Sequence, residues 1–211
     1  MSVVPMPRFS GNVKPNGNNV MSGLSPAGNC LIRKFQPQDA AALREIAEQS
    51  PQAAQWSQQS YEQLHNSGSA TGVGSAVAAP DGPPVGPKVD PGIAPYSTSP
   101  ITSHVLIWVV ESAGRLCAFL VVRIIADEAE ILNLAVKPVN RRQGIATRLL
   151  QTAIRDCIAA GAGRLFLEVR ESNAGAIIFY EQVGFAKSGR RNRYYGDPQE
   201  AAVIMETKLT G

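Results

Sequence analysis

The stretch RRQGIATRLL, residues 141–150, decides how the rest of the chain is interpreted. It follows a strand-like run, ILNLAVKP (131–138), and it opens a run whose apolar residues recur at helical spacing. Gly144 stands where the helix begins, with Arg141 and Arg142 before it. A strand that turns through glycine into a helix can form an anion site, because backbone N–H groups and the positive end of the helix dipole point to the same spot.

Two common phosphate-binding motifs are absent from this stretch. It contains neither the G-x-x-x-x-G-K-[ST] loop of nucleotide hydrolases nor the G-x-G-x-x-G fingerprint of dinucleotide-binding domains. A diphosphate still fits such a turn, and the guanidinium group of arginine suits phosphate oxygens. Taken alone, the pattern leaves a second interpretation open, in which this is an ordinary strand-to-helix turn with solvated arginines.

The composition of the chain is typical of a globular protein. It has 211 residues, 44% of them hydrophobic, and a net charge of +3 without a lysine- or arginine-rich block, so we expect no direct nucleic-acid partner. No run approaches 18 apolar residues and the start lacks the order of a signal peptide, so we expect no membrane partner and a cytoplasmic location. Three widely spaced cysteines indicate neither a disulfide framework nor a metal site.

Two segments differ in composition from the rest. Residues 1–28 contain four prolines, four glycines and no acidic residue, which predicts a disordered N-terminal tail. Residues 66–103 contain six glycines and seven prolines, which predicts a low-complexity insertion. The remainder of 29–208 is of the usual size for one domain, interrupted by this insertion.

Strand and helix patterns alternate along that domain. Strands are predicted at 30–35, 104–112, 115–126, 128–136, 164–169, 184–195 and 201–209, and helices at 37–49, 57–64, 144–160 and 174–183. Ser57 and Asn173 stand where N-cap residues are expected. The order β-α-α-β-β-β-α-β-α-β-β predicts an α/β (α+β) fold with a mixed sheet of about seven strands and four helices, rather than a doubly wound one.

Several motifs resemble those of the GNAT acetyltransferase superfamily. R-R-Q-G-I-A fits the R/Q-x-x-G-x-G/A motif on which its members hold the pyrophosphate of acetyl-CoA. The blocks ILNLAV (131–136), LEVRESN (167–173), FYEQVGF (179–185) and RRNRYY (190–195) are most similar to those of RimI-type ribosomal-protein-alanine N-acetyltransferases. The resemblance is strong over 104–208 and weaker over 29–64.

This resemblance implies the function as well as the GNAT fold. The donor would be acetyl-CoA, with no metal, and the acceptor would be a protein N-terminus, most closely the N-terminal alanine of a small-subunit ribosomal protein. The chain departs from the family pattern in its long insertion and in lacking a proline before Trp56. The acceptor is therefore less well defined than the donor.

The chemistry of acetyl transfer requires a neutral amine, a stabilised oxyanion and a proton for the leaving thiolate. By resemblance, Glu168 would be the base, Tyr180 the acid and the backbone N–H of Val136 the oxyanion donor. An α-amino group has a pKa of about 7.7–8.0, so a modest base is enough, and a phenol near 10 can protonate a thiolate whose conjugate acid is near 8.5.

The remaining site residues also follow from the resemblance. Those expected to bind acetyl-CoA are Leu134, Ala135, Val136, Arg141, Arg142, Gln143, Gly144, Ile145, Ala146, Thr147 and Asn173. Trp56 and Tyr194 are expected to line the acceptor cleft.

Each catalytic assignment has a structural alternative. Glu168 could be an outward-facing strand carboxylate paired with Arg170, and Tyr180 could pack in the core with its hydroxyl at the surface. Two other functions also stay open: a GNAT enzyme that acetylates a small-molecule amine, and a non-catalytic acyl-CoA-binding sensor. The presence of both Glu168 and Tyr180 argues against the sensor, which needs neither.

Overall fold

A computed structural model describes residues 30–67 and 103–209. The predicted tail at 1–28 lies outside the described residues. So does the predicted insertion, except for its first two residues, Asn66 and Ser67, and its last, Ser103, which belong to the helix and strand on either side.

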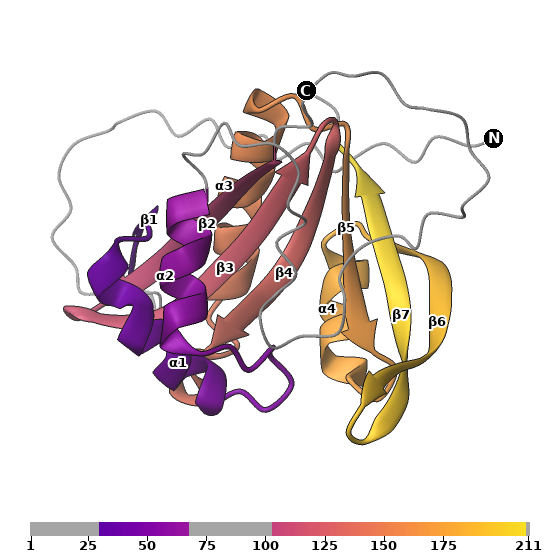
Figure 1. Cartoon of the computed structure of the whole chain (residues 1–211), viewed down its shortest axis with the longest axis horizontal. Helices are drawn as coiled ribbons and strands as arrows, with labels where there is room; N and C mark the ends of the chain where they lie inside the picture. Colours follow the sequence, from indigo (N-terminus) through magenta and orange to yellow (C-terminus); the bar gives the residue numbers. More distant parts are fainter. Residues whose placement is uncertain (1–29, 68–102, 210–211) are drawn as a thin grey trace, which may run out of the picture.

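The predicted order of elements is confirmed over the described residues (Figure 1). The strands are β1 (Cys30–Lys34), β2 (Ser103–Ser112), β3 (Arg115–Ile125), β4 (Glu128–Val136), β5 (Arg164–Arg170), β6 (Ala186–Gly196) and β7 (Gln199–Lys208). The α-helices are α1 (Ala40–Glu48), α2 (Gln58–Ser67), α3 (Ile145–Ala159) and α4 (Ala174–Gln182), and short 3-10 helices occupy Pro37–Asp39 and Pro138–Asn140.

The boundaries differ from the sequence patterns by a few residues. The first predicted helix begins as the 3-10 turn Pro37–Asp39, because proline fits the first turn, where its missing N–H leaves no bond unmade. Ser57 caps α2 as predicted, since its Oγ accepts the N–H of Ser60 at 3.1 Å. The helix then runs three residues beyond its predicted end, to Ser67.

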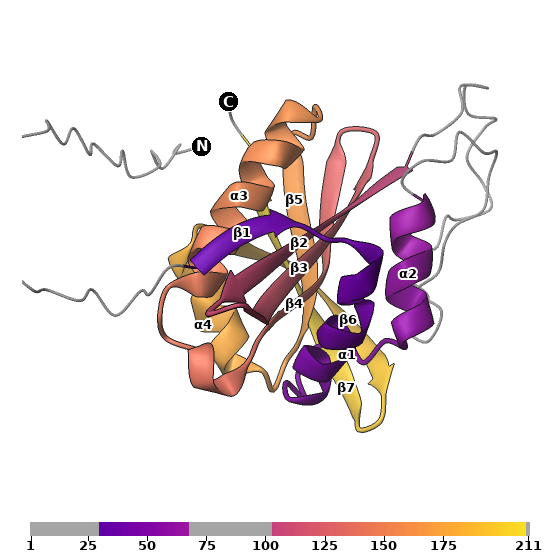
Figure 2. The ribbon, with the colours of Figure 1, turned by 90° about the vertical axis from the view of Figure 1, so that its left-hand side faces the viewer.

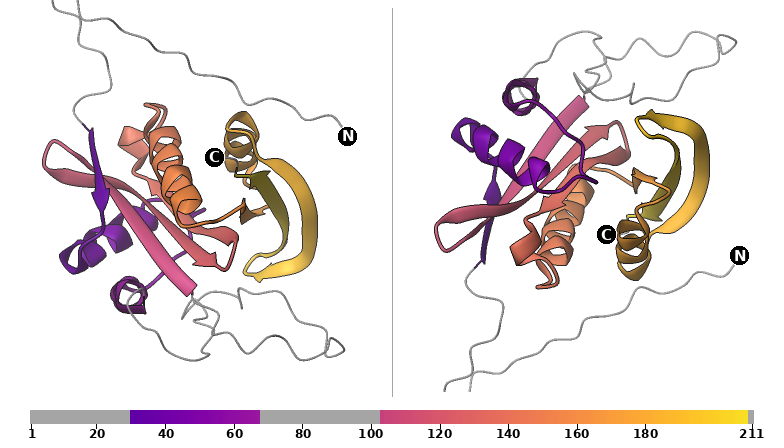
Figure 3. Two further views of the ribbon diagram at one scale, coloured as in Figure 1. Left: turned by 90° about the horizontal axis from the view of Figure 1, so that it is seen from above. Right: turned by 90° about the horizontal axis from the view of Figure 1, so that it is seen from below.

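The seven strands form one mixed sheet in the order β1-β2-β3-β4-β5-β7-β6. Every neighbouring pair is antiparallel except β4 and β5, which run parallel with α3 as their crossover. The helices α1 and α2 cover one face of the sheet, and α3 and α4 lie on the other, as Figures 2 and 3 show. Each face has its own apolar core, with Leu43, Ile46 and Phe119 in the first and Leu149, Leu150 and Met205 in the second.

The parallel pair separates before either strand ends. The strands β4 and β5 are paired only where Glu128–Ile131 lies beside Arg164–Leu167. Beyond that point β4 continues to Val136 and β5 to Arg170, and their ends diverge in Figure 1. Backbone groups on the facing edges are thereby freed from the ladder at the middle of the sheet.

Within the described ranges, no helix combines the length and apolar character needed to cross a membrane.

Candidate active site

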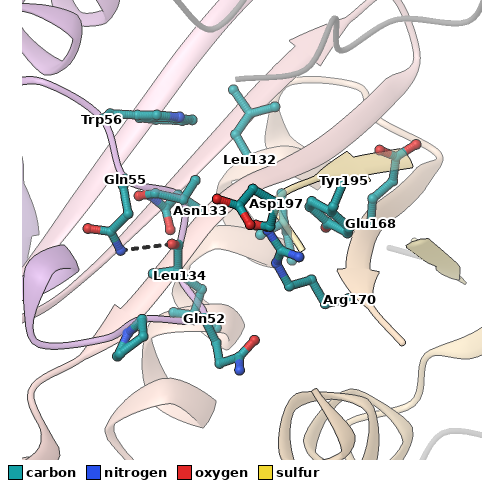
Figure 4. A pocket seen from close by; sticks show the side chains of 14 residues that line it. Gln52, Gln55, Trp56, Leu132, Asn133, Leu134, Glu168, Arg170, Tyr195 and Asp197 are labelled. Carbon is teal, nitrogen blue, oxygen red and sulfur yellow. Dashed lines mark hydrogen bonds between the residues drawn. The ribbon is translucent and has the colours of Figure 1, made fainter. Parts of the chain in front are cut away.

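A cavity of about 400 Å³ opens where β4 and β5 separate (Figure 4). Two strands and two connecting segments form its walls. The lining residues are Pro51, Gln52, Ala53, Ala54, Gln55 and Trp56 before α2, Ile131, Leu132, Asn133 and Leu134 of β4, Glu168 and Arg170 of β5, and Tyr195 and Asp197 at the β6–β7 turn. The structure thus brings the predicted Glu168 and Trp56 together across 112 residues of sequence.

Glu168 is the buried carboxylate of this cavity, with its side chain 9% exposed. Its Oε1 lies 3.0 Å from Nε of Arg191, and its Oε2 is buried without a hydrogen-bond partner among the described residues. The alternative pairing with Arg170 is not observed, because Arg170 pairs with Glu200 at 3.4 Å. Arg191 therefore holds one oxygen of Glu168, and the other is enclosed without a hydrogen-bond partner among the described residues.

The two tyrosines of the RRNRYY block have different positions. Tyr195, rather than the predicted Tyr194, is among the residues lining the cavity. Burial, followed by the neighbouring Glu168 carboxylate, raises the pKa of Tyr194, which lies beside that carboxylate. Burial and the charge of Glu168 raise the pKa of Tyr195 to about 12. Both phenols are therefore protonated at neutral pH, and Tyr194 contacts the candidate base rather than the cavity.

Tyr180 lies near the C-terminal end of α4 and packs into the core. Its ring packs against Phe179 and Phe185, with centroids 5.1 and 5.4 Å apart, and only 6% of the residue is exposed. Burial raises the pKa of its hydroxyl. Tyr180 is not among the residues that line the Glu168 cavity. The ring of Tyr180 therefore contributes to core packing, and the role of its hydroxyl as the acid stays a prediction.

The end of β4 presents backbone N–H groups to the opening between the strands. The N–H of Lys137 bonds to the carbonyl of Cys117 at 2.8 Å, and Val136 lies opposite Ala118. Hydrogen-bonded and non-bonded pairs alternate in an antiparallel ladder, so Val136 directs its N–H and C=O away from β3. Its carbonyl oxygen accepts hydrogen bonds from Nε of Arg141 at 3.0 Å and from Oγ of Ser50 at 3.4 Å. The N–H groups of Val136 and, two residues earlier, Leu134 therefore face the gap.

The glycine turn before α3 has the geometry of an anion cradle. Gly144 has φ +72° and precedes Ile145, the first residue of the helix. A helix leaves its first N–H groups without intrahelical partners, here including those of Ile145, Ala146 and Thr147. A Cβ at Gly144 would meet nothing within 4 Å, so the turn itself is not crowded. These residues fit the diphosphate of acetyl-CoA.

The polar side chains of the turn have distinct roles. Besides its contact with Val136, Arg141 places Nη2 3.0 Å from Oγ of Ser50, so it braces the turn against the segment after α1. Arg142 is exposed, in the left-handed region with φ +61°. Nε2 of Gln143 bonds to the carbonyl of Val139 at 3.2 Å. Arg142 is therefore the more exposed candidate of the two arginines, and its contact with a phosphate stays a prediction.

Asn173 caps α4 as predicted, because its Oδ1 accepts the N–H of Ala176 at 3.2 Å. A contact between Asn173 and acetyl-CoA stays a prediction. With respect to metals, residues 30–67 and 103–209 contain no group of three or more histidine, cysteine, aspartate or glutamate side chains placed to hold an ion.

Several lining residues were missed by sequence reasoning. They are Gln52, Gln55, Asn133, Arg170, Tyr195 and Asp197. A signal was present for Asn133 alone, because it is a polar residue inside the otherwise apolar strand ILNLAV. The others lie in segments whose spatial position depends on tertiary structure.

Comparison with known proteins gives the same assignment as the geometry. The model of the acetyltransferase (GNAT) family matches residues 88–185. The [ribosomal protein bS18]-alanine N-acetyltransferase of Escherichia coli (strain K12) is 42% identical over 99 residues, which are 46% of this chain and 67% of that protein.

Solved structures share the fold over most of the chain. The ribosomal-protein-S18-alanine N-acetyltransferase from Escherichia coli matches with a TM-score of 0.61 and 25% identity, over 87% of this chain and 96% of that one. The PaiA N-acetyltransferase from Thermoplasma acidophilum, in complex with coenzyme A, has the same fold, with a TM-score of 0.60 and 20% identity over 85% and 99% of the two chains. The chain belongs to the GNAT family of acetyltransferases, enzymes that take their acetyl group from acetyl-CoA.

Proposed function

We propose that this protein is an N-terminal acetyltransferase whose acceptor is the N-terminal alanine of a small-subunit ribosomal protein. The observation that carries the proposal is Glu168, which lines a cavity at the separation of β4 and β5 and has one carboxylate oxygen unpaired among the described residues. The similarity to a [ribosomal protein bS18]-alanine N-acetyltransferase supports this acceptor. Such an acceptor is made in the cytoplasm, where we expect the enzyme to act.

Glu168 is the proposed general base. Its Oε2 receives a proton from the α-amine of the acceptor, directly or through a water, while Arg191 holds Oε1. An α-amine has a pKa of about 7.7–8.0, so on the order of a tenth of it is already neutral at pH 7 and can attack while its proton passes to Glu168. The base therefore needs correct placement more than unusual strength.

The donor side of the reaction is assigned to β4, α3 and α4. Acetyl-CoA, when bound, supplies an acetyl group activated as a thioester. The turn at Gly144 and the first N–H groups of α3 hold its diphosphate, with Arg142 at the rim. The N–H groups of Leu134 and Val136 donate to the carbonyl oxygen as it gains negative charge. Tyr180, protonated because burial raises its pKa, gives a proton to the departing sulphur.

Mass spectrometry of peptide products tests the acceptor assignment. The enzyme is incubated with acetyl-CoA and either a peptide with a free N-terminal alanine, an N-blocked peptide that contains lysine, or a panel of polyamines. The proposal predicts one added acetyl group on the free alanine terminus and none on the blocked peptide. Acetylation of a polyamine alone would replace the proposal with a small-molecule acceptor, and binding without consumption of acetyl-CoA would replace it with a sensor.

A further inference from the structure

We infer that Asn133 positions the acceptor: its side-chain oxygen accepts a hydrogen bond from the first peptide N–H, the one that follows the reacting α-amine. This inference rests on the proposed function, because it presupposes a peptide in the cavity.

Only the nitrogen end of the Asn133 side-chain amide has hydrogen-bond partners among the described residues. The residue is 4% exposed, and its Nδ2 donates to the carbonyl of Ala54 at 2.9 Å and to the hydroxyl of Tyr61 at 3.3 Å. A carbonyl can only accept, so the contact with Ala54 fixes which end of the amide is nitrogen. The other end, Oδ1, is buried without a hydrogen-bond partner among the described residues. Buried amide oxygens are normally paired, so a bound group is the expected partner.

A bulge in β4 places Asn133 at the cavity. Val122 lies opposite Ile131 and Val121 opposite Asn133, so Leu132 is an extra residue in the strand. In a regular strand, Leu132 and Asn133 would point to opposite faces. With the extra residue, Leu132 packs in the same core as Val121, on the α1–α2 face, and Asn133 contacts α2 there as well. Both line the cavity, as Figure 4 shows, and bulges commonly re-aim side chains in this way beside active sites.

Two residues that each carry a buried, unpartnered acceptor atom therefore line one cavity from different strands. Oε2 of Glu168 comes from β5 and Oδ1 of Asn133 from β4, and neither has a partner in the described part of the chain. The N-terminus of a peptide presents two successive N–H groups, the α-amine and the first peptide N–H. The amine must reach the base, so the peptide N–H is left for Asn133. A polyamine has no peptide N–H, which makes Asn133 a determinant of specificity for peptides.

N-methylation of the acceptor tests this contact. Two peptides with a free N-terminal alanine are compared, one of which carries a methyl group on the peptide nitrogen of residue 2. For the wild-type enzyme we expect kcat/KM to fall by about tenfold or more on methylation, because Asn133 then loses its partner. For Asn133→Leu the same methylation should change kcat/KM by less than about twofold. The ratio is taken within one enzyme preparation, so a reduced folded fraction cancels.

Tyr61→Phe is the matched control. It removes one partner of Nδ2 but keeps the bond to Ala54 and leaves Oδ1 in place, so its response to methylation should equal that of the wild type. If Asn133→Leu does not fold, Asn133→Ala removes the same oxygen and gives the same comparison. A wild-type enzyme indifferent to methylation, or an Asn133 variant that keeps the full methylation effect, would overturn the inference. If the unmethylated peptide is not acetylated at all, it is the proposed function that fails.

Discussion

Arg191 reaches Glu168 across an intervening strand. Nε of Arg191 on β6 lies 3.0 Å from Oε1 of Glu168 on β5, although β7 runs between these strands. Arg191 is in register with Ala202 and Glu168 with Ile204, so the contact runs diagonally over β7. The last two strands of the chain therefore position the candidate base, which explains why the catalytic region extends beyond the donor-binding motif.

Replacing Glu168 with Gln should lower kcat by about 10²- to 10⁴-fold, the range for loss of a general base, because the amide cannot take the proton of the amine. Affinity for acetyl-CoA should stay within about twofold, since the proposed donor site is at the N-terminal end of α3. Rates from CoA release and binding from calorimetry check the two expectations. Glu171→Gln is the control, because Glu171 forms a similar pair with Arg190 at 2.8 Å outside the cavity. Equal rates in the two variants would remove Glu168 from the mechanism.

Arg191→Ala should lower the rate at saturating acceptor by about tenfold, since Glu168 then loses the contact that orients its carboxylate. The neighbouring Arg190→Ala breaks an exposed pair of the same type and should leave the rate unchanged. Steady-state kinetics with the alanine peptide compare the two variants. A decrease of the same size in both would indicate a general effect of positive charge on β6, not orientation of the base.

Tyr180→Phe should slow acetyl transfer by about tenfold or more while leaving the melting temperature nearly unchanged, because the ring contacts with Phe179 and Phe185 are retained. The diagnostic measurement uses thioester donors whose leaving thiols differ in acidity. The deficit should shrink as the thiol becomes more acidic, since such a thiolate needs less help from a proton donor. Unchanged rates with every donor would leave Tyr180 as a packing residue.

The order of elements was predictable because it follows from local patterns. Apolar periodicity, Pro37 at the start of one helix and Asn173 at the cap of another are all visible within a few residues of sequence. The orientation of cavity side chains was not predictable, because it depends on irregular strands. The bulge at Leu132 decides which way Asn133 points, and a register shift in β6 lies between Arg191 and Tyr195.

Long-range polar contacts could not be predicted from the sequence either. Arg141 was expected at the rim of the phosphate site, but its guanidinium bonds to Ser50, 91 residues earlier in the chain. No local pattern indicates that contact, since it exists only because the segment after α1 packs against the end of β4. The predicted donor motif could still be recognised in the sequence, because the glycine turn depends only on one residue and on the helix that follows it.

The ion pair at the entry to α1 predicts an acid-dependent loss of stability. Arg33 donates to both oxygens of Asp39, at 2.7 and 3.0 Å, and the N–H of Gln36 adds a third bond at 2.8 Å. Burial opposes ionisation of Asp39, but these bonds outweigh it, and its pKa lies below the ordinary value of 3.8. The carboxylate therefore stabilises the fold above that value, and the contribution disappears as the pH falls through the lowered pKa.

Asp39→Asn should accordingly lower the free energy of unfolding by about 2 kcal/mol at pH 7, the scale of a hydrogen bond to a charged group. The difference from the wild type should shrink steadily as the pH is lowered from about 5 toward 2, because the wild-type carboxylate becomes protonated too. Urea unfolding of both proteins across this range measures the difference. A gap that stays constant with pH would mean that the substitution disturbs packing at this position rather than the ion pair.

The two ends of α3 offer a controlled test of the donor site. Gly144 precedes the helix with φ +72° and Gly161 follows it with φ +88°, and a Cβ at either would meet nothing within 4 Å. Replacement of either glycine by valine should therefore cost similar backbone strain, about 1–2 kcal/mol of stability, for the same conformational reason. Only Gly144→Val places its side chain where backbone N–H groups are expected to meet the diphosphate. Calorimetry should show acetyl-CoA affinity reduced at least tenfold in that variant and unchanged in Gly161→Val, whereas equal affinities would move the phosphate site away from this turn.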